Sequence, residues 1–488
     1  MKEKELCVEQ TDRQANRTDA LLALIRDSKP MTFAQRIRLT VLLSVPAVIA
    51  QLSSIVMQYI DAAMVGHLGA EASASIGLVS TTTWLFGGVC SAAAMGFSVQ
   101  VAHRIGAGDM AGARRVLKQS LAATLAFSLF LAAVGCAVSG PLPALLGGDL
   151  AIRSDASLYF FIFSMFLPAI QMSFLAGAML RCSGNMRVPS VMGVAMCVLD
   201  VIFNFFLIFP TRTIELAGMS LSLPGAGLGV GGAALGTAVA EAISAAVLLW
   251  YLWSRSEQLG LRKERARFLP EVSTLRKAFR IGVPMGIEHI VICGAQIMTT
   301  VIVAPLGIFA IAANSFAITA ESLCYMPGYG IADAATTLSG QCIGAARRRL
   351  ARSFGRITVG MGMAVMGVMG VLMYVFAPQI IGLMTTVGEI KGLGVMALRI
   401  EAFAEPMFAA SIVAYGVFVG AADALEPCLM NVFSIWVVRL SLAALLAPTM
   451  GLKGVWIAMC IELCFRGLIF LVRLRGRRWM KGGSAQNL

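Results

Sequence analysis

Charged residues are scarce in this chain: Asp, Glu, Lys and Arg make up 13% of its 488 residues, whereas 58% of the residues are hydrophobic. The mean hydropathy of +0.81 excludes an ordinary soluble domain. Apolar runs of roughly eighteen residues or more predict helices that cross a bilayer, and the sequence contains twelve of them. These runs are long and apolar on all sides, which excludes the short alternating strands of a membrane barrel.

Sequence motifs of enzymes are also absent. The chain has no Walker A, HExxH or GxSxG pattern, so we expect neither ATP drive nor hydrolysis and no enzyme. Gly227, Gly229 and Gly232 match GxGxxG, but a membrane span follows and we expect no strand before them, which argues against a dinucleotide site. Gly232 and Gly236 instead form a GxxxG pair, typical of membrane helices that approach closely.

The eleven cysteines are scattered without a CxxC pair. This pattern predicts small core residues rather than disulfides or metal ligands. The start of the chain also lacks a short apolar core followed by a small-residue cleavage site, so we expect no cleaved signal peptide.

The formal net charge of +13 is distributed as in a membrane protein rather than a nucleic-acid-binding protein. If the amino terminus lies inside the cell, the arm, the inside loops and the tail together carry 32 Lys and Arg, and the opposite loops carry five. This asymmetry predicts a multi-pass protein of the cell membrane with both termini in the cytoplasm. We expect the lipid bilayer and small molecules as partners, and no nucleic acid.

The spans fall into two sets of six, separated by a basic linker. The predicted segments are a polar cytoplasmic arm over 1–37, with a short amphipathic helix near Leu21 to Ile25, an N-terminal six-helix bundle over 38–253, the cytoplasmic linker over 254–280, a C-terminal six-helix bundle over 281–475, and a cytoplasmic tail over 476–488.

A fixed offset of 238 residues relates the two halves. The matching residues are Pro46 with Pro284, Leu68-Gly69 with Leu306-Gly307, Ile105-Gly106-Ala107 with Ile343-Gly344-Ala345, and Pro189 with Pro427. The register changes only after the fifth span, where the first half carries about sixteen extra residues in an outside loop. We therefore expect an all-α polytopic membrane protein, with twelve transmembrane helices in two pseudo-symmetric bundles around a central cleft.

One carboxylate, Asp61, lies in the apolar first span. At about 1.5 Å per residue it is about 22 Å along the helix axis from Pro46, which removes a backbone hydrogen bond and lets the helix bend. A carboxylate in the hydrocarbon costs at least ~2.5 kcal/mol and usually faces a cavity, a partner or a transported ion. If the first, fifth and sixth spans pack together, Asp200, Asn204 and Thr237 join Asp61 in an oxygen-rich cluster for H⁺ or Na⁺. The alternative is a satisfied structural network.

The second half lacks acids at the matching positions, which hold Thr299, Val438 and Leu442, so we expect asymmetric coupling. Glu462 and Arg466 lie one helical turn apart and predict an internal ion pair. The secondary candidates for cation or substrate binding are Glu288, His289, Glu321 and Glu405.

From about residue 35 to residue 475 the chain resembles the MATE family (multidrug and toxic compound extrusion). The resemblance rests on PAVIAQLSSIVMQYIDAAMVGHLG, VAHRIGAGD, LRCSGNMRVPSVMGVAMCVLDVIFNFFLIF, IGVPMGIEHI and LSGQCIGAA. It implies a secondary transporter that exports cationic, amphiphilic compounds in exchange for H⁺ or Na⁺, with no cofactor and no metal other than Na⁺. It also implies that Asp61 is the main coupling residue, assisted by Asp200, Asn204 and Thr237.

The sequence departs from the family pattern at two places. In one family pattern Asn precedes Asp by four residues in the fifth span, whereas here Asp200 precedes Asn204. Some Na⁺-coupled members carry acids in the seventh and tenth spans; Glu288 matches the first, but Phe408 stands at the second.

Two other functions remain open. The first is a lipid-linked oligosaccharide flippase of the same superfamily, which needs a cationic cleft to hold pyrophosphate, whereas the charges inside these spans are mainly acidic. The second is a receptor or membrane scaffold without transport, which does not need buried acids in one bundle. For all three functions we expect a monomer.

Overall fold

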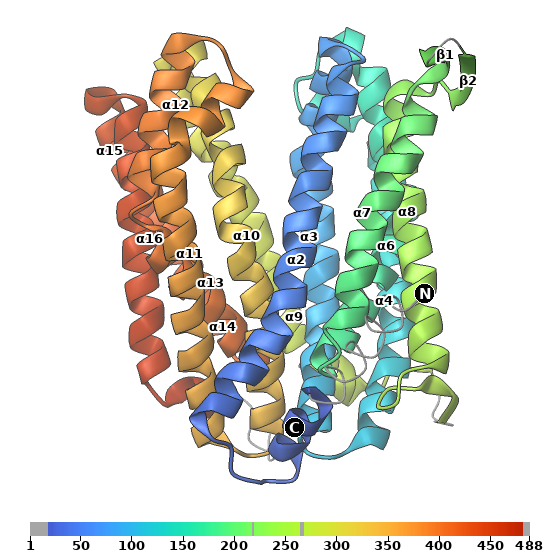
Figure 1. Cartoon of the computed structure of the whole chain (residues 1–488), viewed down its shortest axis with the longest axis vertical. Coiled ribbons are helices and arrows are strands. Elements are labelled where there is room, and N and C mark those ends of the chain that lie inside the picture. Colours follow the sequence, from blue (N-terminus) through green and yellow to red (C-terminus); the bar gives the residue numbers. More distant parts are fainter. Residues whose placement is uncertain (1–17, 217–218, 264–267, 482–488) are drawn as a thin grey trace.

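The structure, a computed structural model, describes residues 18–216, 219–263 and 268–481 (Figure 1). Within these residues eleven helices are long and apolar enough to cross a membrane, and two consecutive helices that meet at 60° form a twelfth span. The predicted all-α membrane fold is confirmed.

The first six spans form one bundle. Its helices are α2 (Phe33–Gly66), α3 (Ala70–Gly106), α4 (Met110–Ser139), the short α5 (Leu142–Leu145), α6 (Leu150–Cys182), α7 (Arg187–Ile208) and α8 (Gly229–Ser254). The helix over residues 18–26 precedes them, and its buried Leu22 and Ile25 confirm the predicted amphipathic helix of the arm.

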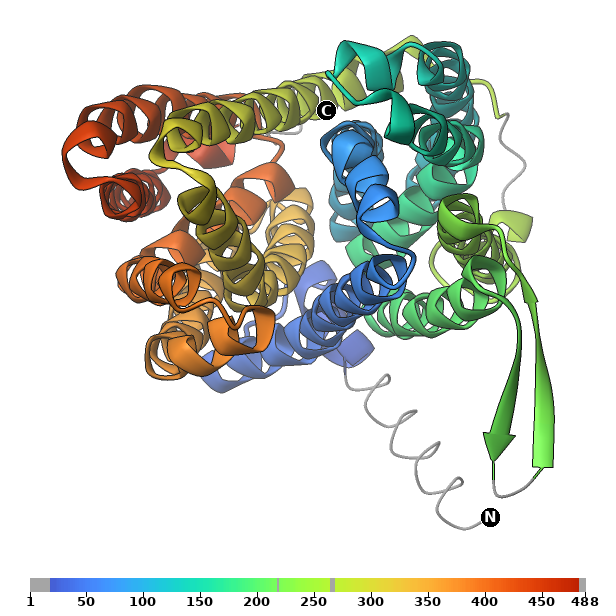
Figure 2. The ribbon, with the colours of Figure 1, turned by 90° about the horizontal axis from the view of Figure 1, so that it is seen from above.

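The last six spans form the second bundle, beside the first (Figures 1 and 2). The short turn η1 (Leu261–Lys263) precedes it and packs against α8 of the first bundle. The elements of the second bundle are α9 (Val272–Val303), η2 (Ala304–Leu306), α10 (Ile308–Gly344), α11 (Arg348–Met384), α12 (Gly388–Glu401), α13 (Glu405–Gly420), α14 (Leu425–Phe433), the π-helical turn η3 (Ser434–Arg439), α15 (Leu440–Met450), α16 (Leu452–Arg475) and η4 (Arg478–Lys481). Helix α9 begins at Val272, within the predicted linker, because the residues before the apolar span are also helical.

The extra residues of the first half form a β-hairpin. Strand β1 (Pro210–Leu216) pairs antiparallel with β2 (Met219–Ala226), and Figure 2 shows the hairpin projecting from the first bundle. The expectation that no strand precedes Gly227 was therefore wrong. A hairpin is not the βαβ unit of a dinucleotide site, so that reading remains unsupported.

Repeat-related residues open equivalent helices. Gly69 and Gly307 precede α3 and α10 with φ of +116° and +99°, a region that favours glycine because a Cβ is strained there. Thr32 precedes α2 as the N-cap of a capping box. The Thr32 hydroxyl accepts from the backbone N–H of Gln35, and the Gln35 side chain accepts from the backbone N–H of Thr32.

The end of the molecule that carries the Lys- and Arg-rich loops is called the basic end. The two bundles meet there in a reciprocal contact. His103 Nε2 lies 2.8 Å from the carbonyl oxygen of Gly420, and Gln341 Nε2 donates to the carbonyl of Cys182 at 3.0 Å. Gln341 and Gly420 are the repeat partners of His103 and Cys182, at the offset of 238. The bundles are thus joined here by repeat-related groups that make equivalent bonds in both directions.

Glycines allow this approach. A Cβ on Gly106 would lie 2.1 Å from the carbonyl oxygen of Gln341, and a Cβ on its repeat partner Gly344 would lie 2.0 Å from that of His103. The helix over 18–26 covers the same end: Leu22 and Ile25 belong to a core formed mainly by α10, α11 and α13, and the Leu24 carbonyl accepts from Arg347 at 2.8 Å.

Substituting Gly106 by Ala tests this contact. The added methyl group meets backbone, so we expect a loss of roughly 1–3 kcal/mol, visible as a lower thermal unfolding temperature in detergent. Gly87→Ala on the same helix is the control, because nothing lies within 4 Å of its Cβ position; it should leave stability unchanged or raise it. Equal melting of the two variants would contradict the contact.

Candidate functional site

The predicted cluster of Asp61, Asp200, Asn204 and Thr237 is assembled in the first bundle. Asn204 Nδ2 donates to Asp61 Oδ1 at 2.9 Å and to Asp200 Oδ2 at 3.2 Å. Thr237 donates to the carbonyl of Ala233 at 3.2 Å, and its hydroxyl also interacts with Asp200. One amide therefore joins two carboxylates from two helices, with α8 closing the third side.

Burial makes this arrangement unusual for ionised groups. Asp200 is 0% exposed and Asn204 is 1% exposed, while Asp61 is half-buried. The carboxyl groups of Asp61 and Asp200 are close enough to interact, and repulsion between two buried negative charges disfavours ionisation of both. Among the described residues, neither carboxylate makes an ion pair with Lys, Arg or His, and Asp200 Oδ1 and Asn204 Oδ1 have no hydrogen-bond partner.

The GxxxG pair brings α8 against the cluster. A Cβ on Gly232 would lie 2.5 Å from the Leu207 carbonyl oxygen, and one on Gly236 would lie 2.1 Å from Asn204 Oδ1. This geometry confirms the predicted helix-packing role of the pair. It also explains how the Asn204 side chain is held in one orientation.

Two nearby residues were missed from the sequence. Glu241 on α8 interacts with Asp200 and Ser173, and its Oε2 has no hydrogen-bond partner among the described residues. It lies one turn beyond Thr237 in an apolar span, so its spacing was a usable signal. Tyr159 on α6 lies within electrostatic range of Asp61 and Asp200, and no sequence pattern identified it.

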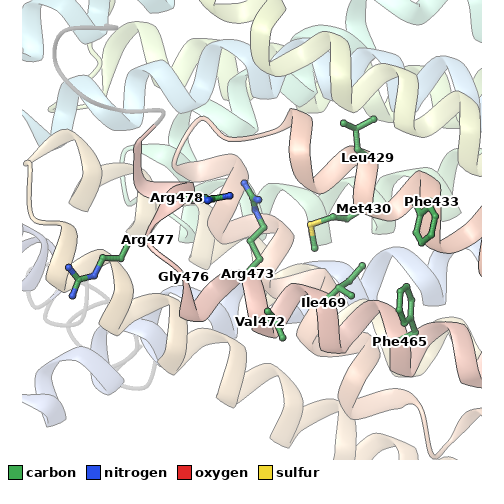
Figure 3. Close-up of a pocket in the computed structure, with 10 residues that line it drawn as sticks. All are labelled: Leu429, Met430, Phe433, Phe465, Ile469, Val472, Arg473, Gly476, Arg477 and Arg478. Carbon is green, nitrogen blue, oxygen red and sulfur yellow. The ribbon is translucent and has the colours of Figure 1, made fainter.

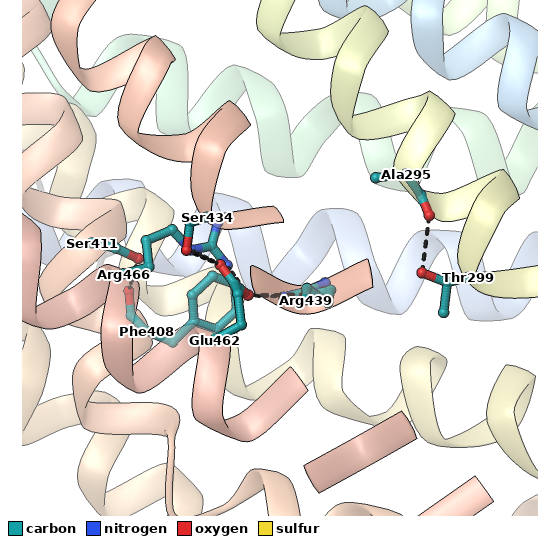
Figure 4. Close-up of polar contacts among 8 residues, drawn as sticks. All are labelled: Ala295, Thr299, Phe408, Ser411, Ser434, Arg439, Glu462 and Arg466. Atoms are coloured by element: carbon teal, nitrogen blue, oxygen red, sulfur yellow. Dashed lines mark hydrogen bonds and ion pairs between the residues drawn. The ribbon is translucent and has the colours of Figure 1, made fainter. Parts of the chain in front are cut away.

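The equivalent place in the second bundle lacks the acid. Thr299, the repeat partner of Asp61, donates to the Ala295 carbonyl of its own helix at 2.9 Å (Figure 4). The two halves therefore differ at this position, and asymmetric coupling stays a prediction.

One carboxylate of the second bundle, Glu462, is held by two arginines. Glu462 lies 2.7 Å from Arg439 Nη2 and 3.0 Å from Arg466 Nε, and it accepts from Ser434 at 2.6 Å (Figure 4). The ion pair of Glu462 with Arg466 is thus confirmed. The π-helical turn η3 begins at Ser434 and ends at Arg439, which directs both of these side chains toward Glu462.

Glu288 and His289 take separate positions. Glu288 is buried and accepts from Tyr415 Oη and Asn431 Nδ2, so it belongs to the second bundle. His289 instead packs edge-on against Trp84 of α3, with ring centroids 5.6 Å apart. The two neighbouring candidates therefore do not form one site.

Glu321 and Glu405 meet another acid, Glu401, deep in the second bundle. Glu401 and Glu405 are the last residue of α12 and the first of α13, on either side of the 60° break. Both are fully buried, and none of their carboxyl oxygens has a hydrogen-bond partner among the described residues. No group of three His, Cys, Asp or Glu side chains in the described ranges has the geometry of a metal site.

Pro46 lies within α2, which the structure shows as one helix over Phe33–Gly66. Directly after it, α2 crosses α10 so closely that a Cβ on Gly330 would lie 2.7 Å from the Val48 nitrogen. The proline therefore lies next to a contact between the bundles, although a bend at this residue stays a prediction.

Comparisons with known proteins agree with this architecture. A Vibrio cholerae MATE transporter, VcmN, is 18% identical over 94% of this chain and 97% of its own, with a TM-score of 0.79. A MOP superfamily transporter from Pyrococcus furiosus is 20% identical over 93% and 97%, with a TM-score of 0.83. At these identities the similarity establishes the fold, that of a twelve-span membrane protein built from two repeated bundles.

The chain belongs to the MatE family. The family model matches residues 46–206 and 284–445, two segments that begin at the repeat partners Pro46 and Pro284. A probable multidrug resistance protein NorM from Thermotoga maritima is 25% identical over 446 residues, covering 90% of this chain and 92% of the relative. NorM from Pseudomonas aeruginosa is 28% identical over 426 residues, covering 84% and 83%. The protein is thus a membrane transporter and not an enzyme.

Glu462→Gln tests the clamp in the second bundle. The substitution removes the charge that the buried Arg466 and the partly buried Arg439 share, so we expect a loss of about 3–5 kcal/mol of folding stability, measured by thermal unfolding in detergent. Glu71→Gln, at an exposed position on α3, is the matched control and should change stability by less than about 0.5 kcal/mol. A Glu462→Gln protein as stable as the control would disprove the clamp.

Proposed function

We propose that the protein is a secondary active antiporter that exports cationic or amphiphilic compounds, as a monomer, in exchange for H⁺ or Na⁺. The observation that carries the proposal is the double hydrogen bond from Asn204 to Asp61 and Asp200. Two neighbouring carboxylates without a basic partner favour a bound cation. A site of this kind can take up and release one.

The contrast between the bundles supports this assignment. Glu462 is neutralised by two arginines within its own bundle and therefore has little need of an external cation. Asp61 and Asp200 have an amide and a hydroxyl instead, which orient their oxygens without cancelling the charge. An exchangeable cation is therefore expected in the first bundle.

Glu241 extends the site along α8. Helix α8 runs from the hairpin end toward the basic end, whereas α2 and α7 both end near the hairpin. Asp61 on α2, Asp200 on α7 and Glu241 on α8 therefore lie successively farther from the hairpin end. In the orientation predicted by the loop charges, this order leads from outside to inside. We assign Glu241 to the inner step of cation release.

The cycle then follows from the two bundles and their contacts. The cycle starts with the basic end, which faces the cytoplasm, closed. Asp61 takes a cation from outside, and its pairing with Asn204 relaxes. Helix α2 then bends near Pro46, and the substrate leaves. The reciprocal contact at Gly106 and Gly344 separates, and the cation leaves inward through Glu241. One charge crossing 100 mV provides ~2.3 kcal/mol, which exceeds the ~1.4 kcal/mol cost of a tenfold gradient of an uncharged substrate. Exchange of one cation for a monovalent cationic substrate moves no net charge, so the concentration gradient of the coupling cation drives that exchange.

Cationic substrates agree better with the spans than anionic ones. The arginines deep in the second bundle, Arg439 and Arg466, are both bound to Glu462 and are not available for a pyrophosphate. Among the described residues, carboxyl oxygens of the acids Asp200, Glu401 and Glu405 inside the spans lack a hydrogen-bond partner. This distribution favours drug export over a lipid-linked oligosaccharide flippase.

Reconstituted protein tests the proposal. H⁺ and Na⁺ gradients are imposed separately across proteoliposomes, and the movement of ethidium is followed by fluorescence. We expect one of the two gradients to drive transport in wild-type protein. Transport by neither gradient would refute antiport driven by H⁺ or Na⁺.

Asp61→Asn is the decisive variant. The amide keeps the size of the side chain but removes the charge, so gradient-driven transport should fall to the level of empty liposomes while thermal stability is retained. Asp155→Asn, at an exposed position on α6, is the matched control. Wild-type transport by Asp61→Asn would move the coupling site, with Glu288 as the next candidate.

Glu241→Gln separates cation uptake from release. Because Glu241 lies beyond Asp200, we expect the variant to slow the maximal rate of gradient-driven transport. The rate falls by about tenfold if the barrier to cation release rises by ~1.4 kcal/mol. The cation concentration for half-maximal rate should stay near that of wild type. An unchanged maximal rate would exclude Glu241 from the pathway.

A further inference from the structure

A groove lies between α14 and α16 at the basic end of the second bundle (Figure 3). Its volume is about 650 Å³. The apolar residues along it are Leu429, Met430 and Phe433 of α14 and Phe465, Ile469 and Val472 of α16. Leu429, Phe433 and Val472 are more than half exposed, and α15 and α16 lie at the edge of the molecule in both views. The groove therefore opens toward the membrane.

Arginines line one end of this groove. Arg473 is held by ion pairs with Asp423 and Glu426, which fix its side chain. Arg477 and Arg478 are exposed, and neither has an acidic partner among the described residues. In Figure 3 Arg473 and Arg478 extend toward the same end of the groove, whereas Arg477 points away. The groove thus combines an apolar length with a positively charged end.

The same pattern recurs on the other side of α16. A groove of about 460 Å³ lies between α11 and α16, with Arg356 and Arg475 among its lining residues. Its other lining residues are apolar or glycine: Val359, Gly360, Met363, Leu471 and Leu474. Both grooves lie at the end of α16 that carries the excess of Lys and Arg.

We propose that the groove between α14 and α16 binds an anionic phospholipid of the leaflet at the basic end. Arg478 binds the phosphate, because a guanidinium group offers two parallel donors to phosphate oxygens, whereas Arg473 stays bound to Asp423 and Glu426. One acyl chain lies along Phe433, Phe465 and Ile469. Charge complementarity selects this occupant: the arginines lie where the spans end, at the level of lipid headgroups.

A bound lipid also acts on the closed end of the transporter. Arg478 belongs to η4, whose next residues, Trp479 and Met480, are buried in the core that contains Leu22 and Ile25 of the arm helix. Holding Arg478 therefore holds the η4 turn in that core. We expect the lipid to stabilise the conformation in which the basic end is closed.

The test measures lipid retention by the purified full-length protein in detergent. Phosphatidylglycerol or phosphatidylcholine is added, and bound lipid is counted by native mass spectrometry beside thermal unfolding. We expect phosphatidylglycerol to be retained and to raise the unfolding temperature, and phosphatidylcholine to do neither. Arg478→Gln should weaken phosphatidylglycerol binding by about fivefold, the contribution of one arginine at a membrane surface.

Two further variants separate the groove from general surface charge. Arg349→Gln removes an exposed arginine at the same end that lines neither groove, and it should bind as wild type does. Ile469→Trp fills the groove and keeps every arginine, so it should weaken binding even where Arg478→Gln fails to fold. Equal retention of the two lipids, wild-type retention by Ile469→Trp, or an equal loss in Arg349→Gln would each overturn the proposal. None of these measurements depends on transport.

Discussion

A charge inside the hydrocarbon layer must be neutralised, and this constraint organises both bundles. The second bundle meets it internally at Glu462, which two arginines contact, whereas Glu401 and Glu405 have no hydrogen-bond partner among the described residues. The first bundle surrounds Asp61 and Asp200 with an amide, a hydroxyl and closely packed glycine, all of which orient the carboxylates without cancelling their charge. In the proposed function, a cation from outside supplies the neutralisation there.

The same constraint explains why the two halves share a backbone but not a chemistry. The repeat preserves the positions where helices begin and cross, because Gly69, Gly307, Gly106 and Gly344 are required by the backbone itself. Side chains inside each bundle are free to differ once the crossings are kept. Thr299 in place of an acid shows this divergence at the position that matters most for coupling.

The sequence predicted the twelve spans and the cluster around Asp61, because long apolar runs and isolated acids are strong signals in a membrane protein. It did not predict the β-hairpin, whose strands are short and lie outside the repeat. Tyr159 was missed because it approaches Asp61 only through tertiary packing. Glu321 and Glu405 were candidates from the sequence, but their approach to Glu401 also arises from tertiary packing. The separation of His289 from Glu288 has the same origin: adjacent residues on a helix face different neighbours.

The reciprocal bonds, from α3 to α13 and from α10 to α6, have the geometry of a two-fold dimer interface, in which one patch binds its own copy. A half-length protein with this surface would need no second kind of subunit to pair with itself in the membrane. The covalent linker then adds only proximity, and the two halves produced as separate chains retain complementary surfaces through which to reassemble. Fusion also lets the two halves diverge, as the repeat pair of Asp61 and Thr299 shows.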